Sequence, residues 1–263
     1  MILYLIILLI ILFIYFKNKH TEHYGNKKRI YIINLDRDKE RLSKLKKNGN
    51  MFNINRIKAV EGSKLDTDIM KKDGILKMDN ESFRYSKDGI KDTFKGSIGC
   101  SLSHINLWKK LKNENKNKND QYFIIFEDDS ILNSNSHIQI ERCLNNIKQL
   151  DIDWDIIFLG GSRVYGERVG EFIRAKYVNS WMNCGLFAYI INKNSIDKLI
   201  SKALPINTYI DMQINKYYGT DINAFYTYPS IIKHNYDFGS SRDKHLTKYD
   251  NKFIEDAEKV FII

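Results

Sequence analysis

Short apolar runs alternate with amphipathic and polar segments along most of this chain of 263 residues. The runs have the length and residue types of buried β-strands; the fourth ends in glycines, and Gly62 closes the second. They are RIYIIN (29–34), NINRIKAV (53–60), QYFIIF (121–126), DIIFLGG (155–161), NCGLFAYIIN (183–192) and NAFYTYPSIIKH (223–234), the last interrupted at Pro229.

Helical patterns separate these runs. Residues 35–49 predict a loop that enters a basic helix ending at Gly49, and residues 96–111 repeat apolar or small residues at helical spacing. Further helices are expected over 136–148, 194–204 and 209–219, whereas 64–95 and 162–180 show little periodicity and are expected to be loops. The alternation predicts an α/β domain over 29–250, a sheet with helices on both faces, followed by a tail at 251–263.

The first sixteen residues, MILYLIILLIILFIYF, are apolar and uncharged. As a helix they would cover roughly 24 Å, slightly less than the hydrocarbon core of a bilayer. The segment lacks the basic start and small-residue cleavage site of a signal peptide, so 1–16 is predicted to be an uncleaved membrane anchor and 17–28 a polar linker. The basic residues that follow favour a cytoplasmic body. A lumenal body, and a buried core helix in place of an anchor, stay open as alternatives.

Composition narrows the function classes. Hydrophobic residues make up 43% of the chain, which is typical of a folded globular protein. The net charge of +10 would suit an anionic partner, but the lysines are scattered, so nucleic acid is not expected as a partner. Cys100, Cys143 and Cys184 form no CxxC pair, and their spacing indicates neither a disulfide framework nor a zinc site.

Three adjacent carboxylates follow the apolar run at 121–126: Glu127, Asp128 and Asp129. Ligands of α/β sheets collect at the carboxyl ends of strands, and adjacent like charges are stabilised by a cation. Hard oxygen ligands favour Mn²⁺ or Mg²⁺. In an extended backbone Glu127 and Asp129 point to the same side, and Asp128 points away. An acidic turn or a helix N-cap is the alternative interpretation of this spacing.

Six blocks follow one another along the chain: IYIINLDRDKERL, GSIGCSLSH, FIIFEDD, DIIFLGG, CGLFAYIINKNSIDKLI and YPSIIKH. Their order resembles glycosyltransferase family 25, which includes lipopolysaccharide and procollagen galactosyltransferases. The resemblance covers roughly residues 29–241, and its most specific parts are GCSLSH and the EDD strand. It implies a GT-A-like, Rossmann-type fold and a metal-dependent, inverting transfer of a hexose, galactose or glucose, from a UDP-sugar to a protein or glycan acceptor.

The resemblance also implies roles for individual residues. Glu127 and Asp129 would hold Mn²⁺ (or Mg²⁺), and His234 occupies a place where many GT-A enzymes bring in a last metal ligand. His104 is expected to have a positioning role, with a satisfied core histidine as the alternative; for Arg41 the alternative is a solvated helix face. The expected donor-binding residues are Ile33, Asn34, Leu35, Asp36, Arg37, Arg41, Gly99, Ser101, Ser103, His104 and Asp128.

An inverting transfer needs a base for the acceptor hydroxyl. The family pattern has an acid close to a proline at the position where this chain has Asn207, so the base is predicted to be the next acid, Asp211. An N-cap or surface role for Asp211 is the alternative. The departure at Asn207 keeps a second function open, a catalytically silent, membrane-anchored nucleotide-sugar-binding or scaffold protein. A basic nucleic-acid-binding domain is a further rival.

Overall fold

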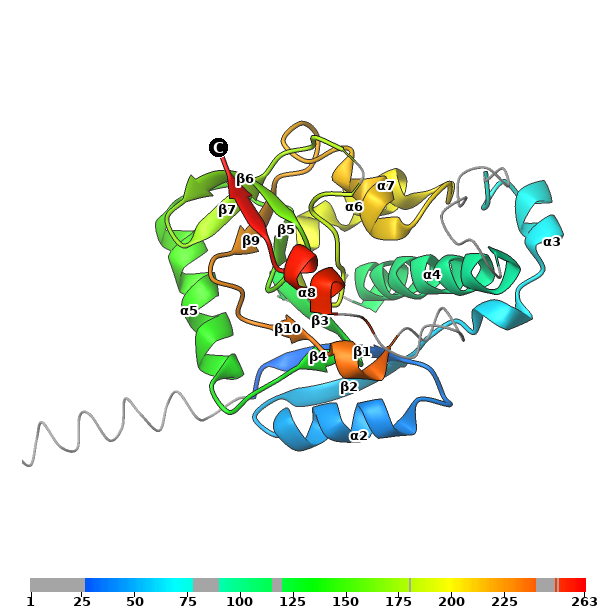
Figure 1. Ribbon diagram of the computed structural model, residues 1–263, viewed down its shortest axis with the longest axis horizontal. Helices are drawn as coiled ribbons and strands as arrows, with labels where there is room; N and C mark the ends of the chain where they lie inside the picture. Colours follow the sequence, from blue (N-terminus) through cyan, green and yellow to red (C-terminus); the bar gives the residue numbers. More distant parts are fainter. Residues whose placement is uncertain (1–26, 78–89, 115–119, 180, 240–248, 250) are drawn as a thin grey trace, which may run out of the picture.

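A mixed β-sheet forms the centre of the computed structural model, which describes residues 27–77, 90–114, 120–179, 181–239, 249 and 251–263. The strands are β1 (Arg29–Asn34), β2 (Asn53–Lys58), β3 (Tyr122–Glu127), β4 (Ser130–Ile131), β5 (Ile156–Phe158), β6 (Val164–Val169), β7 (Phe172–Ala175), β8 (Ala188–Asn192), β9 (Ala224–Thr227), β10 (Lys233–His234) and β11 (Val260–Ile262). Nine of them form one sheet in the order β11-β6-β7-β9-β5-β8-β3-β1-β2, and β10 pairs with β4 separately (Figure 1).

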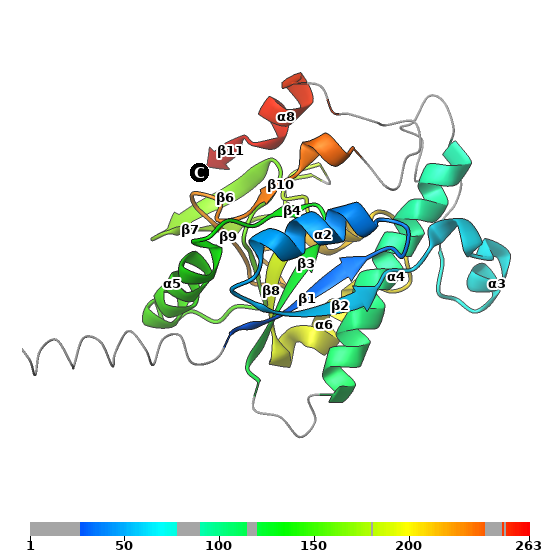
Figure 2. The same ribbon diagram turned by 90° about the horizontal axis from the view of Figure 1, so that it is seen from below.

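Helices cover both faces of this sheet, as the alternating pattern predicted. They are α2 (Lys39–Asn48), α3 (Thr67–Lys72), α4 (Ile90–Glu114), α5 (Ser136–Gln149), α6 (Ile196–Ala203), α7 (Ile210–Asn215) and α8 (Asn251–Ala257). Buried side chains of α4, α6 and α7 share one core with Tyr31 and Ile33, and those of α2 and α5 share a second core with Ile30 and Ile32. Alternate residues of β1 therefore face opposite helix layers. Figures 1 and 2 show α2 and α4 on opposite sides of β1.

The direction of the strands brings two sequence blocks to one edge. Strand β1 pairs in parallel with both β2 and β3, and Ile33 of β1 stands opposite Glu127 of β3. Asn34, the last residue of β1, and the acidic residues after β3 consequently leave the sheet at the same edge. Strand β8, antiparallel to β3, enters the sheet at this edge and brings the residues before Ala188 beside them.

Several segments differ from the sequence expectations. Residues 162–180, expected as a loop, contain the antiparallel pair β6 and β7. Glycines and charged residues in this pair obscure the alternating pattern of a strand. The segment 64–95 contains α3 and the start of α4. The stretch expected as a strand from 183 forms an isolated bridge from Cys184 to Ser162 and becomes a strand only at Ala188. Residues 251–263, expected as a tail, form α8 and β11, which pairs in parallel with β6.

The expected anchor at 1–16 and most of the linker lie outside the described residues, and the anchor stays a prediction. Within the part of the chain that is described, no helix is both long enough and apolar enough to cross a bilayer.

Asp155, at the start of β5, is a buried carboxylate that connects three elements. It accepts hydrogen bonds from the hydroxyl of Ser195, from Lys198 Nζ at 2.8 Å and from the backbone N–H of Asn223 at 2.8 Å. These bonds join β5 to α6 and to the segment that precedes β9. They offset the cost of burying a charge and are structural, because Asp155 does not line the pocket described below.

Candidate functional site

A pocket opens at the carboxyl ends of β1 and β3, between these strands, α4 and α7. Its walls include most of the predicted site residues, which come from five separate stretches of the chain. Folding therefore brings the predicted donor-binding, metal-binding and base residues into one pocket. The predicted residues that line it are Ile33, Asn34, Leu35, Arg37, Arg41, Ser103, His104, Glu127, Asp128, Asp129, Asp211 and His234.

Three predicted donor-binding residues, Asp36, Gly99 and Ser101, do not line this pocket. The Asp36 carboxylate is exposed and accepts from Lys58 and Arg56, each at 2.6 Å, and these hydrogen bonds lower its pKa to about 2. A Cβ on Gly99 would lie 2.8 Å from the backbone oxygen of Val60, so glycine allows α4 to approach that loop. The Ser101 hydroxyl donates to the carbonyl oxygen of Ser97 at 3.1 Å, inside α4.

Two carboxylates lie side by side in a turn after β3. Asp128 and Asp129 are both buried, and Arg41 Nη1 approaches them at 3.5 and 3.7 Å. Burial first, and the negative charge of Asp129 second, raise the pKa of Asp128 to about 7; the hydrogen bond from Asn34 and the charge of Arg41 offset part of this. The two carboxylates therefore form a site that favours positive charge, part of which Arg41 supplies.

Arg41 is not the solvated helix residue that the sequence allowed as an alternative. It is 8% exposed, and its Nη2 donates to the carbonyl oxygens of Phe238 and Gly239 at 3.1 and 3.3 Å. Its guanidinium also lies over the Phe238 ring, 5.1 Å from the centroid. Arg41 thus connects α2, the acidic turn and the segment after β10.

Asn34 orients the carboxylate of Asp128. Its Nδ2 donates to Asp128 Oδ2 at 2.6 Å and to the carbonyl oxygen of Asp38 at 2.9 Å, while its Oδ1 accepts from Arg56 Nε at 2.8 Å. Because both ends of the amide are engaged, the Asn34 side chain has a single favourable orientation. Arg56 lies on the polar side of β2, where nothing in its spacing distinguishes it from an ordinary exposed residue.

His234 reaches the acidic turn through a backbone pairing. Strand β10 places it opposite Ser130 of β4, and its Nε2 lies 3.3 Å from Asp129 Oδ2. The ring also contacts Phe187, with centroids 5.4 Å apart. An oxygen of Asp129 and an imidazole nitrogen of His234 are the donors that could hold a divalent cation on this side of the pocket, with the Asp128 carboxylate beside them.

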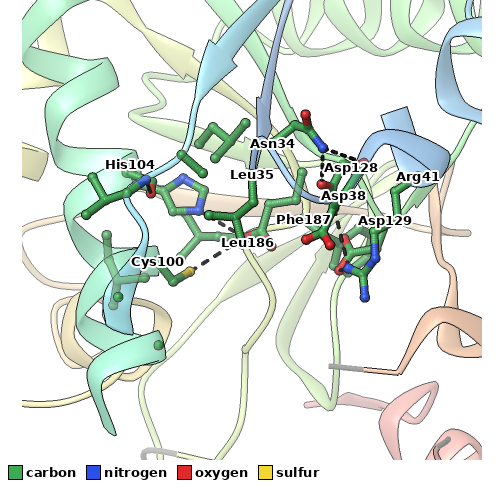
Figure 3. Close-up of a pocket in the computed structure, with 18 of the residues that line it drawn as sticks. Asn34, Leu35, Asp38, Arg41, Cys100, His104, Asp128, Asp129, Leu186 and Phe187 are labelled. Atoms are coloured by element: carbon green, nitrogen blue, oxygen red, sulfur yellow. Dashed lines mark hydrogen bonds and ion pairs between the residues drawn. The ribbon is translucent and has the colours of Figure 1, made fainter. Parts of the chain in front are cut away.

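Glu127 and Asp129 have different neighbours, contrary to the expectation that they act from the same side. Glu127 Oε1 lies 2.9 Å from His104 Nε2 and 4.0 Å from Cys100 Sγ. The physical reason is the turn at 128–129, which ends the extended backbone on which the alternation depends. In Figure 3, Cys100 and His104 of α4 lie on one side of the pocket, and Asp128, Asp129 and Arg41 lie on the other.

His104 is buried, as the core alternative required, yet it also touches the pocket. Its Nδ1 lies 2.8 Å from the hydroxyl of Tyr189, which accepts a hydrogen bond from Trp108 Nε1 at 3.0 Å. Its Nε2 faces Glu127, so the ring joins a buried aromatic pair to a carboxylate on the pocket wall. This geometry suits the positioning role that the sequence predicted.

Asp211 lies in the first turn of α7 and lines the pocket. Its Oδ2 accepts from the backbone N–H of Gly185 at 3.1 Å, and its Oδ1 accepts from that of Met212 at 2.9 Å. Asn207 does not line the pocket, and its N–H donates to Gln213 Oε1. Asp211, the residue predicted to be the base, therefore faces the site, whereas the neutral Asn207 does not.

Some pocket residues were not singled out from the sequence. They are Asp38, Glu61, Cys100, Gly185, Leu186, Phe187, Gly239 and Tyr249, among others. A usable signal existed for Cys100, which stands one helical turn before His104 in GSIGCSLSH. Gly185 to Phe187 belong to the block CGLFAYIIN, which was interpreted only as a strand. Glu61 pairs with Arg37, whose hydrogen bond lowers the pKa of the Glu61 carboxyl; this contact is between separate loops and has no local pattern.

A pocket of this kind, at the carboxyl ends of parallel strands and lined by few but convergent polar groups, defines a small-molecule site in an α/β protein. The chain belongs to glycosyltransferase family 25: the family model described as "Glycosyltransferase family 25 (LPS biosynthesis protein)" matches residues 27–214. This range contains β1, the acidic turn and Asp211.

Individual relatives are more distant. Procollagen galactosyltransferase 2 of Homo sapiens is 25% identical over 226 residues, covering 77% of this chain and 34% of that protein. Procollagen galactosyltransferase 1-A of Xenopus laevis is 22% identical over a match that covers 87% of this chain and 38% of that protein. The Bos taurus protein named "Probable inactive glycosyltransferase 25 family member 3" is 21% identical over a match that covers 78% of this chain and 36% of that protein. The chain thus spans about a third of the length of these relatives.

Proposed function

We propose that this protein is a metal-dependent, inverting glycosyltransferase with a GT-A-like fold. It would transfer a hexose, galactose or glucose, from a UDP-sugar to a hydroxyl of a protein or glycan acceptor. The observation that carries the proposal is a single pocket that combines a carboxylate–imidazole group, Asp128, Asp129 and His234, with the separate carboxylate of Asp211. Galactose is favoured as the sugar because the relatives include procollagen galactosyltransferases.

The residues present fit a divalent cation such as Mn²⁺ or Mg²⁺. Burial first, and repulsion by the adjacent Asp129 second, raise the pKa of Asp128, and Arg41 approaches the two carboxylates only at 3.5 and 3.7 Å. Asp129 and His234 would hold the ion, with Asp128 beside them, whereas Glu127 faces Cys100 and His104. When bound, the ion would neutralise charge that develops on the departing diphosphate.

The protein's own groups would bind and orient the donor. Ile33 and Leu35 supply apolar surface at the end of β1, where the uracil ring would lie, and Asn34 and Asp128 supply polar groups for the ribose. Arg41 would contact a phosphate group while keeping its bonds to the segment after β10. These assignments follow from the pocket walls together with the resemblance of the first strand to the family.

Asp211 would act as the base. In an inverting displacement the acceptor hydroxyl oxygen forms its bond to the anomeric carbon as the bond to the UDP oxygen breaks, and the hydroxyl proton passes to the carboxylate. The backbone N–H groups of Gly185 and Met212 hold this carboxylate in place, and each oxygen keeps a lone pair for the incoming proton.

A catalytically silent nucleotide-sugar-binding protein is the second candidate. Two observations favour it: the bovine relative is named as probably inactive, and Asn207 stands where the family pattern has an acid. Such a protein would bind the donor but would not transfer the sugar. The position of Asp211 on the pocket wall favours the enzyme over this alternative.

Release of UDP from UDP-galactose and UDP-glucose, with procollagen peptides and glycans as acceptors, tests the proposal. We expect acceptor-dependent UDP release by the full-length protein. In Asp211→Asn the rate of release should fall by about 10²-fold or more, while the variant still binds UDP. The matched control is Asp221→Asn, an exposed acid paired with Lys202 outside the pocket. Binding without release under any acceptor and metal condition would favour the silent protein.

A further inference from the structure

One wall of the pocket brings together a thiol, an imidazole and a carboxylate. Cys100 and His104 are four residues apart on α4, so both lie on the helix face that packs toward β3, and Glu127 is the last residue of β3. The donor atoms of the three side chains all lie within 4.8 Å of one another, and in the described parts of the chain no other set of three histidine, cysteine or acidic residues meets this spacing. All three residues line the pocket.

We propose that Cys100, His104 and Glu127 form a transition-metal site that binds Zn²⁺, separate from the Asp128, Asp129 and His234 group. Tetrahedral Zn²⁺ with bonds of about 2.0–2.3 Å places its ligand atoms roughly 3.3–3.6 Å apart. Here the His104–Glu127 distance is 2.9 Å and the Cys100–Glu127 distance is 4.0 Å. Closing the three atoms on an ion requires side-chain movements on the order of 1 Å.

The surroundings of His104 match those of a metal-bound histidine. Such a ring usually donates its second N–H to a fixed acceptor, which sets its tautomer and orientation. Here Nε2 faces Glu127, and Nδ1 lies 2.8 Å from the Tyr189 hydroxyl, whose own position is fixed by the Trp108 indole. His104 and Tyr189 are both fully buried, so this support is rigid.

Ligand chemistry separates this site from the other. A thiolate and an imidazole select Zn²⁺ over Mn²⁺ or Mg²⁺, whereas carboxylate oxygens at Asp128 and Asp129 suit the harder ions. Three protein ligands leave the fourth tetrahedral position open toward the pocket, where water or a ligand atom would complete the shell. The spacing of the cysteines could not indicate this site, because Glu127 is distant from Cys100 in the sequence and is brought to it only by the packing of α4 on the sheet.

Cobalt provides the test, because Co²⁺ occupies zinc sites and gives a near-ultraviolet charge-transfer absorption only when a thiolate is bound. The full-length protein, kept in mild detergent because of its apolar start, is titrated with Co²⁺ without nucleotide. We expect a saturable band that Zn²⁺ removes and that Cys100→Ser abolishes. Cys184→Ser is the matched control and keeps the band. Tyr189→Phe should weaken Co²⁺ binding about 10-fold or more.

The measurement is independent of sugar transfer, so the proposed function and this site can fail separately. Asp129→Asn, which alters the other group, should keep the thiolate band. Circular dichroism establishes that each variant is folded. A folded wild-type protein without the band, a band that persists in Cys100→Ser, or a band lost in Asp129→Asn would overturn the proposal and leave the three side chains as a hydrogen-bonded cluster.

Discussion

Replacing Arg41 by glutamine removes the cation that faces two buried carboxylates. The side chains of Arg41, Asp128 and Asp129 are 10%, 10% and 12% exposed, so water can do little to screen the charges that remain. Arg41 also donates to the carbonyl oxygens of Phe238 and Gly239, which would lose a charged donor. The substitution should therefore destabilise the fold in the region of the pocket.

The expected loss in the free energy of unfolding is about 3 kcal/mol. Removing one partner of a buried ion pair costs roughly 3–5 kcal/mol. The N–O distances of 3.5 and 3.7 Å to Asp128 and Asp129 exceed the ~2.7–2.9 Å of close charge-assisted bonds, which favours the lower end of that range. A loss of this size changes the unfolding equilibrium constant by about 150-fold.

A divalent cation should restore part of this loss. A ligand that binds only the folded state stabilises it by about 2.7 kcal/mol when its concentration is 100 times its Kd. Arg41→Gln leaves Asp128 and Asp129 without their guanidinium, so Mn²⁺ should stabilise the variant more than it stabilises the wild type. The comparison links the stability of the acidic turn to cation binding without using any sugar donor.

Equilibrium urea unfolding, followed by circular dichroism with and without Mn²⁺, measures both effects. Lys46→Gln is the matched control, because it removes one positive charge from an exposed position of the same helix and should change stability by less than about 0.5 kcal/mol. If Arg41→Gln behaves like this control, the ion pairs contribute nothing measurable. If Mn²⁺ does not favour the variant, the acidic turn is not a cation site.

Three further predictions concern reactivity and stability. Iodoacetamide should modify Cys100, which lines the pocket, before Cys143, whose thiol pKa burial raises to about 12; equal rates by peptide mass spectrometry would contradict this. Asp155→Ala should lower the free energy of unfolding by about 3 kcal/mol without changing UDP affinity, because the Ser195 hydroxyl and the Asn223 N–H lose their acceptor. A loss under about 1 kcal/mol in urea unfolding would contradict this prediction. Gly99→Ala should lower the free energy of unfolding by about 1–3 kcal/mol in the same assay, since the added Cβ would clash with the backbone oxygen of Val60. An unchanged unfolding midpoint would show that the loop at Val60 shifts to accommodate the methyl group.

The parts of the fold that the sequence predicted are those with a local cause. Strands β1 and β3 each have a neighbour on both sides in the sheet and are buried on both faces, so they have continuous apolar runs. Because β1 and β3 are parallel, their carboxyl ends lie at the same edge of the sheet. Asn34 and the acidic turn do meet at this edge. The resemblance of GSIGCSLSH and FIIFEDD to the family correctly predicted that residues of these two blocks line the pocket.

The parts that could not be predicted depend on contacts between distant segments. Strand β11 lies at the sheet edge and has only three residues, and its neighbour β6 carries glycine and charge, so their pairing is not visible in a periodic pattern. The separation of Glu127 from Asp129 depends on the turn between them and on the packing of α4, which supplies His104 as a partner. Arg41 resembles an ordinary basic helix residue until the segment after β10 covers it.

The most direct test of the central claim is calorimetric binding of UDP, UDP-galactose and UDP-glucose to the full-length protein, with and without Mn²⁺. The account predicts binding that requires the metal, that is lost in Asp129→Ala and that is kept in Asp68→Ala, an exposed acid outside the pocket. A folded wild-type protein that binds none of these nucleotides under any metal condition would contradict the assignment of a metal-dependent UDP-sugar site.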